Sequence, residues 1–264
     1  MLKAQDLRIT FNAGTPIETR ALRGLSLEIP TGQFVTVIGS NGAGKSTLLN
    51  AISGEAQLDR GSIQIDGVEL NRMPVWDRAG MVARVFQDPL LGTCEDLTIE
   101  ENLALAASRG SRRGLGRALA AELRAECAER LAKLGLGLEN RLNDRIGLLS
   151  GGQRQAVSLL MAALRPSRIL LLDEHTAALD PRIAAFVLDI TRRIVAERQL
   201  TTLMVTHSMQ QALEIGDRTV MLHQGQVVLD VTGEERGKLD VPQLLQMFER
   251  VRGETVSDDT LLLG

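Results

Sequence analysis

A chain of 264 residues, 44% hydrophobic and 24% charged, can close a substantial core and has the composition of a globular rather than a disordered protein. Its net charge of −3 argues against a protein that coats nucleic acid, because phosphate binding requires a basic surface. No apolar run approaches the roughly 18 residues of a membrane span, and the N-terminus lacks a signal-peptide pattern, so we expect a cytosolic chain.

Short runs of β-branched or purely apolar residues predict strands along most of the chain. In order, the predicted strands are 3–11, 25–29, 34–38, 62–65, 82–86, 169–172, 201–205, 219–223 and 227–231. Several are apolar throughout, which is typical of a sheet that is covered on both faces.

The helices predicted between these strands have start and stop signals. A helix over 45–53 ends at Gly54, a common C-terminal cap. Thr98 to Glu101 forms a capping box that opens a helix toward Ala107, and Asp180-Pro181 supplies an N-cap and a first-turn proline for another. A last helix is predicted over 241–251.

The segment from Asp88 to about Gly152 has few β-branched residues. It carries an apolar stripe at helical spacing that stops at Gly135 and consists of Leu119, Leu123, Cys127, Leu131 and Leu134. We therefore expect a helical subdomain inserted between two strands of an α/β core. The basic run Arg109, Arg112, Arg113 and Arg117 is either a solvated loop and helix face or a patch that meets anionic lipid or a partner.

Gly39 to Ser46 fits the P-loop pattern and lies between a predicted strand and a predicted helix, as that pattern requires. The glycines let backbone N–H groups turn toward phosphate oxygens, and the helix N-terminus adds partial positive charge. Lys45 supplies a charge for the β- and γ-phosphates, and the Ser46 hydroxyl is placed to bind Mg²⁺. The alternative is a glycine-rich turn without a ligand.

The apolar strand that ends at Leu172 is followed by two adjacent carboxylates, Asp173 and Glu174. Ligands of open α/β sheets bind beyond the carboxyl ends of the strands, so Asp173 reaches the P-loop Mg²⁺ if its strand neighbours 34–38. Glu174 would then face the water in line with the γ-phosphate. The alternative is that both acids only cap the next turn.

The segment Leu149-Ser150-Gly151-Gly152-Gln153 precedes a helix predicted to start near Arg154. Ser150 and Gln153 form a capping box, which is a sufficient structural explanation. With the two glycines they can also form a second phosphate cradle at a helix N-terminus. The spacing alone favours neither interpretation.

Taken in order, these motifs resemble the complete motif set of ABC ATPases, and the resemblance covers nearly the whole chain. The segments that carry it are Gly39–Ser46, Gln87, Leu149–Gln153, Ile169–Glu174, Ala178–Asp180 and Val205–His207. The resemblance implies an α/β fold: a P-loop NTPase core of ABC type with an antiparallel β subdomain and an inserted helical subdomain. We expect one ABC ATPase domain over 1–252, with the core in 1–87 and 160–252, the helical subdomain in 88–159 and a tail over 253–264.

The resemblance also implies roles for individual residues. Catalytic roles fall to Glu174, His207, Lys45 and Gln87, and the Mg²⁺ ligands are Ser46, Gln87 and Asp173. The ATP-binding residues are Phe11, Gly39, Asn41, Gly42, Ala43, Gly44, Lys45, Ser46, Thr47, Ser150, Gly151, Gly152, Gln153 and Asp180. In this family the Ser150–Gln153 segment closes on ATP that the other protomer holds.

Two positions leave alternatives open. Phe11 stands where the family usually stacks an aromatic ring on adenine; the alternative is a core residue at the end of a strand. His175 stands where most members have proline, and it either reaches the nucleotide or the partner protomer or is a histidine tolerated in a turn. The two cysteines, Cys94 and Cys127, are predicted to be ordinary reduced thiols.

The implied function is that of an ATPase with ATP and Mg²⁺ as cofactors, working as a homodimer on the cytoplasmic face of the cell membrane. Its implied partners are permease subunits and, indirectly, a solute-binding protein, with no nucleic acid. A single ATPase domain without an attached membrane segment is common in bacterial importers, and 34–55, 84–93 and 170–181 resemble subunits that serve uptake of amino acids and related small solutes. The alternatives are an export or lipid-extraction ATPase and a soluble ABC ATPase that acts on nucleic acid or ribosomes.

Overall fold

The computed structural model describes residues 1–110 and 121–252. Its contacts divide the chain into two compact units. Unit 1 consists of Met1–Arg78 and the chain from Leu200 onward, and unit 2 consists of Ala79–Gln199. Unit 2 is therefore an insertion into unit 1, which contains the parts of the chain on either side of it.

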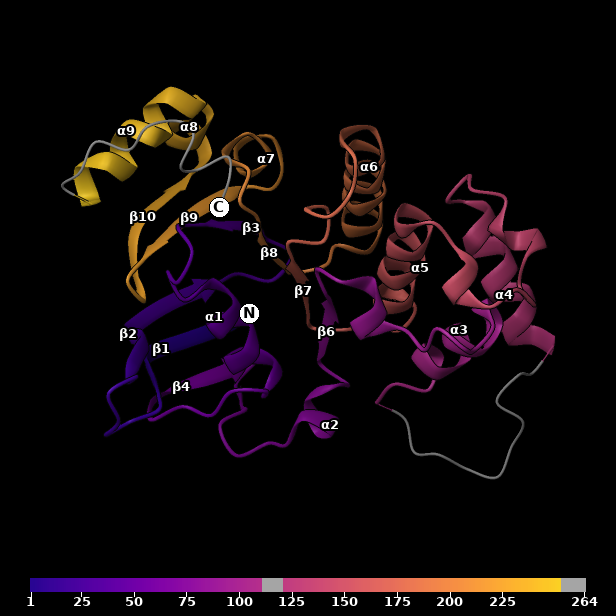
Figure 1. Ribbon diagram of the computed structural model, residues 1–264, viewed down its shortest axis with the longest axis horizontal. Helices are drawn as coiled ribbons and strands as arrows, with labels where there is room; N and C mark the ends of the chain where they lie inside the picture. The colour runs from indigo at the N-terminus through magenta and orange to yellow at the C-terminus, as the bar shows by residue number, and fades with distance from the viewer. Residues whose placement is uncertain (111–120, 253–264) are drawn as a thin grey trace. The chain divides into compact units, whose positions relative to one another are not determined.

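The first sheet of unit 1 is antiparallel. Its strands lie in the order β2 (Thr19–Ile29), β1 (Leu2–Phe11), β4 (Arg60–Ile65) and β5 (Val68–Glu69) (Figure 1). This confirms the expected antiparallel β subdomain. Strand β2 begins six residues earlier than predicted, because its first half pairs with the end of β1, where Phe11 lies opposite Thr19.

The second group of strands in unit 1 is mostly parallel. β3 (Phe34–Ile38) pairs in parallel with β8 (Thr202–Val205) on one side and with β9 (Arg218–His223) on the other. β10 (Gln226–Thr232) is antiparallel to β9. Every residue of β3 and of β8 is buried, as expected for strands that are covered on both faces.

Five helices of the described chain belong to unit 1: α1 (Lys45–Ser53), α2 (Val75–Arg78), α7 (Met209–Glu214), α8 (Gly233–Gly237) and α9 (Val241–Arg252). Figure 1 shows α7, α8 and α9 gathered around the strands β9 and β10. Leu244 and Phe248 of α9 are buried in a cluster with Ile38, Ala212 and Met221. The C-terminal helix therefore packs against the strand that leads into the glycine-rich loop.

Unit 2 contains the parallel pair β6 (Val82–Val85) and β7 (Ile169–Asp173). The elements described between them are the short helices η1 (Pro89–Gly92), η2 (Leu138–Asn140) and η3 (Ile146–Leu148) and the helices α3 (Ile99–Ala107), α4 (Ala121–Ala132) and α5 (Gly151–Ala163). α6 (Pro181–Arg198) follows β7 and runs beside α5 (Figure 1). The expected helical insertion between two strands is present, while its limits of 88 and 159 stay a prediction.

The start signals read from the sequence act as helix caps. Thr98 and Glu101 form the complete capping box of α3, and Asp180 Oδ1 accepts the Ile183 N–H at 3.1 Å at the start of α6. Helix α5 starts at Gly151, three residues earlier than predicted, because its own capping box places the N-cap at Ser150. The apolar stripe is confirmed at Cys127, Leu131 and Leu134, which are buried; Leu123 is half-buried, and Leu119 lies outside the described residues.

Arg109, the first residue of the basic run, binds the carbonyl end of a helix. Its Nη2 donates to the carbonyls of Ala162 and Arg165 at 3.0 and 3.3 Å, at the end of α5, and burial lowers the pKa of its guanidinium. Arg109 is therefore half-buried against the end of α5. Arg112, Arg113 and Arg117 lie outside the described residues.

Other arginines also bind the carbonyl ends of helices. Arg78 Nη1 donates to Ala51 O at 2.8 Å at the end of α1, and Arg198 Nη1 donates to Ala163 O at 2.6 Å at the end of α5. Arg236 Nη2 donates to three carbonyls of α7 and the residue after it: Ala212, Leu213 and Ile215. The last carbonyls of a helix lack partners within the helix, and a cation there also interacts favourably with the negative end of the helix dipole.

None of the helices in residues 1–110 and 121–252 combines the length and the apolar character that a membrane span requires.

Candidate functional site

The glycine-rich loop joins β3 to α1 in unit 1. Gly39 and Gly44 have φ angles of 152° and 99°, and a Cβ atom on either would lie only 2.3 Å from Leu222 O or 2.7 Å from Ala21 O. These two positions therefore admit only glycine. Within the loop the Ala43 N–H donates to Ser40 O at 3.1 Å, which folds the backbone into a tight turn.

The loop ends at the N-terminus of α1, and no side chain caps this helix, since its N-cap residue is Gly44. The backbone N–H groups of the first turn, which include those of Ser46 and Thr47, therefore lie at the end of the helix that carries partial positive charge. Lys45 is buried, and its Nζ donates to Gly39 O at 2.7 Å and to Ser40 O at 3.2 Å. An ammonium group and an uncapped helix start in one tight loop are suited to bind a phosphate chain.

His207 lies at the same edge of the sheet as this loop. β3 and β8 are parallel with Val37 opposite Val205, and the Thr206 N–H donates to Val37 O at 3.1 Å. Ser208 then caps α7 by accepting the Gln211 N–H at 3.2 Å. His207 is therefore fixed between two anchored neighbours, two residues beyond the strand that borders β3.

Phe11, at the end of β1, is 42% exposed. The alternative that it is a core residue is therefore wrong. Its ring is accessible to a ligand, and the adenine-stacking role stays a prediction.

In unit 2, Gln87 and the two acids lie at one edge of the β6–β7 pair. The strands are parallel with Val85 opposite Leu172, so Gln87 and Glu174 each lie two residues beyond this pair; Asp173 ends β7 and Glu174 follows it directly. Asp173 and Glu174 are each only 9% exposed, and Glu174 has a φ of 45°, in the left-handed region. A non-glycine residue in this region costs about 1 kcal/mol or more and is typical of functional sites.

Asp173 is held by an arginine that the sequence pattern did not indicate. Arg84 Nη2 donates to Asp173 Oδ2 at 2.6 Å, and both side chains are nearly buried, with 9% and 12% exposed. The guanidinium carbon of Arg84 also lies 4.7 Å from the centre of the Phe86 ring. Arg84 lies opposite Leu171 in the strand pair, so strand register brings it beside the acid. No linear spacing rule could have identified it.

The segment that opens α5 is a capping box. The Gln153 N–H donates to Ser150 Oγ at 3.3 Å, and the Ser150 N–H donates to Gln153 Oε1 at 3.2 Å. Gly152 is required by packing, because a Cβ there would lie 2.1 Å from Cγ2 of Ile183 in α6, whereas Gly151 is exposed with room for a side chain. The structural explanation is thus confirmed, while binding of a second phosphate stays a prediction.

His175 is not an exposed turn residue. It is 2% exposed, and its Nε2 lies 3.0 Å from Thr191 Oγ1 in α6. Burial lowers the pKa of His175 to about 4, so the ring is neutral at pH 7. His175 thus lies in a turn, as expected, but it is buried there and hydrogen-bonded to α6.

The described residues contain no group of three or more His, Cys, Asp or Glu side chains that could hold a metal ion. A site that binds Mg²⁺ together with a nucleotide does not need one, because Mg²⁺ keeps several waters and takes one or two protein oxygens plus phosphate oxygens. Asp173 and the exposed hydroxyl of Ser46 are oxygen donors of this kind. The chemistry of each of these two residues therefore suits Mg²⁺ bound with a nucleotide.

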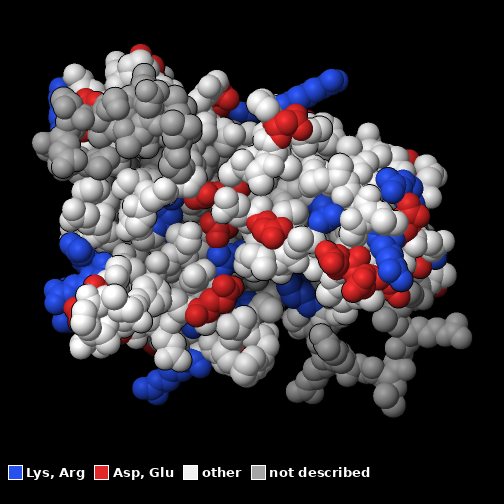
Figure 2. Space-filling model, viewed as in Figure 1, with Lys and Arg blue, Asp and Glu red and all other residues white. Residues whose placement is uncertain are grey.

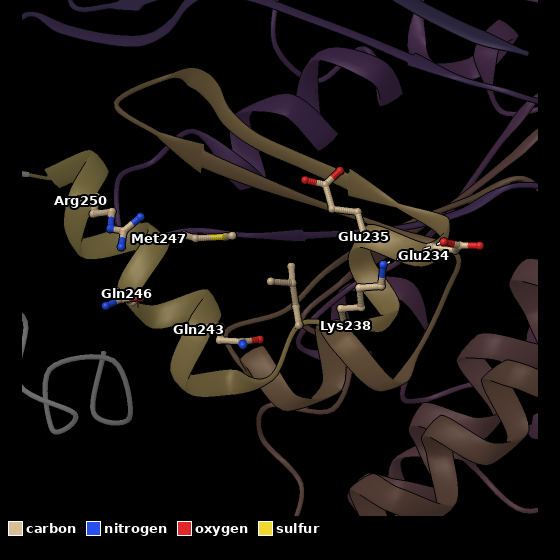
Figure 3. Close-up of a pocket in the computed structure, with 8 residues that line it drawn as sticks. Glu234, Glu235, Lys238, Gln243, Gln246, Met247 and Arg250 are labelled. Atoms are coloured by element: carbon tan, nitrogen blue, oxygen red, sulfur yellow. Dashed lines mark ion pairs between the residues drawn. The ribbon is translucent and has the colours of Figure 1, made fainter.

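An open groove of about 630 Å³ lies between α8 and α9 of unit 1 (Figure 3). Its lining mixes both charges with apolar and amide groups, and Lys238 pairs with Glu234 at 3.9 Å within it. No predicted nucleotide-binding residue lines it. On the face drawn in Figure 2, acidic and basic side chains alternate without a large field of one sign.

The ABC transporter family model matches residues 22–177, more than half of the chain. The chain is 43% identical to the tyrosine transport ATP-binding protein of Clostridioides difficile over 249 residues. The matched region covers 94% of this chain and 99% of that protein. It is 35% identical to the aliphatic sulfonates import ATP-binding protein SsuB 2 of Agrobacterium fabrum, over 81% of this chain and 74% of the relative.

Solved structures agree with the sequence comparisons. The fold matches a dimeric ATP-binding cassette in a post-hydrolysis state bound to ADP and Pi, with a TM-score of 0.76 and 28% identity over 88% of this chain and 98% of the other. The chain thus belongs to the ABC transporter family, as an importer-type ATP-binding subunit that hydrolyses ATP.

Proposed function

We propose that this subunit powers the uptake of an amino acid or a related small solute, by binding and hydrolysing ATP as a homodimer beside membrane permease subunits. The observation that carries the proposal is the 43% identity to a tyrosine transport ATP-binding protein over nearly the full length of both chains. A methionine import ATP-binding protein of Brucella abortus, 34% identical over 85% of this chain, supports the same class of solute, although this chain covers only 58% of that relative.

The loop between β3 and α1 binds the triphosphate in this proposal. The backbone amides of Gly39 through Thr47 surround the phosphate oxygens, and the Lys45 ammonium offsets the charge of the β- and γ-phosphates. Phe11 stacks on the adenine, since its exposed ring at the end of β1 is accessible to a base.

Hydrolysis depends on the residues that follow the strands. Glu174 orients and deprotonates the attacking water, and His207 stabilises the γ-phosphate as it leaves ADP. The Ser46 hydroxyl, the Gln87 amide oxygen and the Asp173 carboxylate supply oxygen ligands for Mg²⁺, which neutralises phosphate charge when bound. The left-handed backbone of Glu174 supports this role, because conformational strain of this kind clusters at active sites.

Ser150, Gly151, Gly152, Gln153 and Asp180 serve the second protomer. The capped start of α5 presents Ser150 and exposed Gly151 to ATP held by that protomer, and Asp180 lies at the start of the neighbouring helix. The similar cassette is dimeric with ADP and Pi bound. ATP binding then closes the homodimer and hydrolysis opens it.

In the cell, the homodimer would act at the cytoplasmic face of the membrane, where Gln87 and the surface around Leu90 and Leu91 meet the permease. Leu91 is 71% exposed and Leu90 39%, which suits a contact with another subunit. A solute-binding protein on the other side of the membrane would select the solute.

A Glu174→Gln variant tests the hydrolytic assignment. It removes the base but keeps the size of the side chain, so we expect ATP binding to persist while turnover falls by about 100-fold or more. Size-exclusion chromatography with Mg²⁺ and ATP should then show a stable dimer. Turnover within a few-fold of the unmodified protein would reject the role of Glu174.

The solute is tested with the complete transporter in proteoliposomes that contain ATP. We expect uptake of labelled tyrosine or another amino acid, with ATPase activity that rises when the loaded solute-binding protein is added. Stimulation by sulfonates or sugars, with no response to any amino acid, would overturn the proposed solute class and leave the ATPase assignment intact.

A further inference from the structure

His175 is a buried polar side chain directly after the proposed catalytic acid. His175 is 2% exposed. Its partner, Thr191, is fully buried in the middle of α6. A buried polar group needs a hydrogen-bond partner, and here the 3.0 Å contact between His175 Nε2 and Thr191 Oγ1 provides one.

The direction of this hydrogen bond follows from the one next to it. Thr191 Oγ1 donates its only proton to Val187 O, one turn earlier in α6, at 2.8 Å. It can therefore only accept from His175, which places the histidine proton on Nε2. The two bonds form a chain from the loop after β7 through the threonine to the main chain of α6.

This chain of hydrogen bonds is attached to a backbone that is held in an uncommon conformation. Glu174 has a φ of 45°, and its carbonyl accepts the Ala177 N–H at 2.9 Å. A left-handed residue that is not glycine persists only where its neighbours hold it. The side chains on either side of Glu174 are both anchored: that of Asp173 to Arg84, and that of His175 to Thr191 of α6.

The loop is also attached to α6 at its far end. Asp180 Oδ1 accepts the Ile183 N–H at 3.1 Å, so residues 174–180 leave β7 and enter α6 between two fixed points on one helix. A loop fixed at both ends has few alternative conformations available, which limits where the Glu174 carboxylate can point.

We propose that His175 is a positioning residue for ATP hydrolysis: it ties the loop after β7 to Thr191 of α6 and so fixes the backbone that aims the Glu174 carboxylate. The inference rests on the proposed catalytic role of Glu174. If His175 only filled core volume, its function would not need a hydrogen-bond donor at Nε2. The need for this donor therefore distinguishes a positioning role from a packing role.

Steady-state kinetics on the full chain test the difference. His175→Leu keeps apolar volume but removes the donor, and we expect kcat to fall by about 10- to 100-fold with the KM for ATP changed less than about two-fold. His175→Gln places an amide N–H near the position of Nε2, and we expect it to recover most of kcat. Thr191→Val should lower kcat as His175→Leu does, and Thr191→Ser should not.

A double variant shows whether the two residues act together. If they form one anchor, His175→Leu with Thr191→Val lowers kcat no further than the stronger single change. Thermal denaturation of each variant measures folding separately. Normal kcat in folded His175→Leu, or no recovery in folded His175→Gln, would overturn the inference. If Glu174→Gln retains turnover, the proposed catalytic role of Glu174 is wrong. If Glu174→Gln loses turnover while His175→Leu does not, only the positioning role of His175 is wrong.

Discussion

Arg84 and Asp173 form a buried ion pair at the end of β7, at the acid that we propose binds Mg²⁺. A buried carboxylate without a counter-charge is costly, and Arg84 supplies that charge at 2.6 Å. The sequence indicated the glycine-rich loop by its fixed spacing and the acids by their place after an apolar strand, and it indicated Gln87 through the resemblance to a family. It indicated neither Arg84 nor the partner of His175, since both pairings join residues brought together only by folding.

We expect Arg84→Met to destabilise the protein by about 3 kcal/mol without nucleotide, because it leaves Asp173 uncompensated. With saturating ATP and Mg²⁺ the loss should shrink, since the bound metal replaces the missing charge. Thermal denaturation under both conditions measures this. Arg193→Met is a matched control, as its pair with Asp189 is exposed and is worth less than about 1 kcal/mol. An equal loss for Arg84→Met with and without Mg²⁺ and ATP would contradict the expectation.

Whether a helix could be predicted depended on how much of its stability is local. The capping box of α3, the proline start of α6 and the glycine end of α1 were read correctly from neighbouring residues. The short helices α2, α7 and α8 were not predicted, and α7 is held in part by contacts distant in sequence. The carbonyls at the end of α7, for example, are bound by Arg236, which lies 21 residues beyond Ile215.

The capping box of α3 should contribute a pH-dependent part of the stability. Glu101 accepts hydrogen bonds from the backbone N–H and the hydroxyl of Thr98, and these lower its pKa below the usual 4.5. The folded state therefore favours the ionised form, and this contribution is present above about pH 4.5 and is lost as pH falls through the lowered value.

Glu101→Gln removes the titrating group but keeps an acceptor for Thr98. We expect the variant to be less stable than the unmodified protein at pH 7, with the difference narrowing as the pH falls toward 3. Urea denaturation across this range measures it. A difference that is constant with pH would show that the charge of Glu101 does not contribute.

Over the whole chain, unit 1 is assembled from segments on both sides of unit 2. The cluster of Ile38, Ala212, Met221, Leu244 and Phe248 joins the strand before the glycine-rich loop to the C-terminal helix. The sequence predicted both the fold class and helix 241–251, but not that this helix completes the core of the nucleotide-binding unit. That pairing spans about 200 residues and leaves no local pattern.

We expect Phe248→Ala to cost about 3–5 kcal/mol, because it empties a fully buried position. The variant should also release ATP at lower temperature, although Phe248 is not a proposed nucleotide ligand. Denaturation and ATP retention measured on one sample test both effects. Ile17→Ala, at a 68% exposed position of the same unit, should change stability by less than about 0.5 kcal/mol. Equal stability of the two variants would refute the packing role of α9.

The chain uses arginine where many proteins use lysine, and only four of its 30 basic residues are lysines: Lys3, Lys133, Lys238 and Lys45. The first three have accessible side chains, whereas Lys45 is 5% exposed inside the glycine-rich loop. An amine-specific acylating reagent should therefore label the side chains of Lys3, Lys133 and Lys238 readily and that of Lys45 slowly. The extent of labelling at Lys45, measured by peptide mass spectrometry, then reports whether the glycine-rich loop is shielded from the reagent.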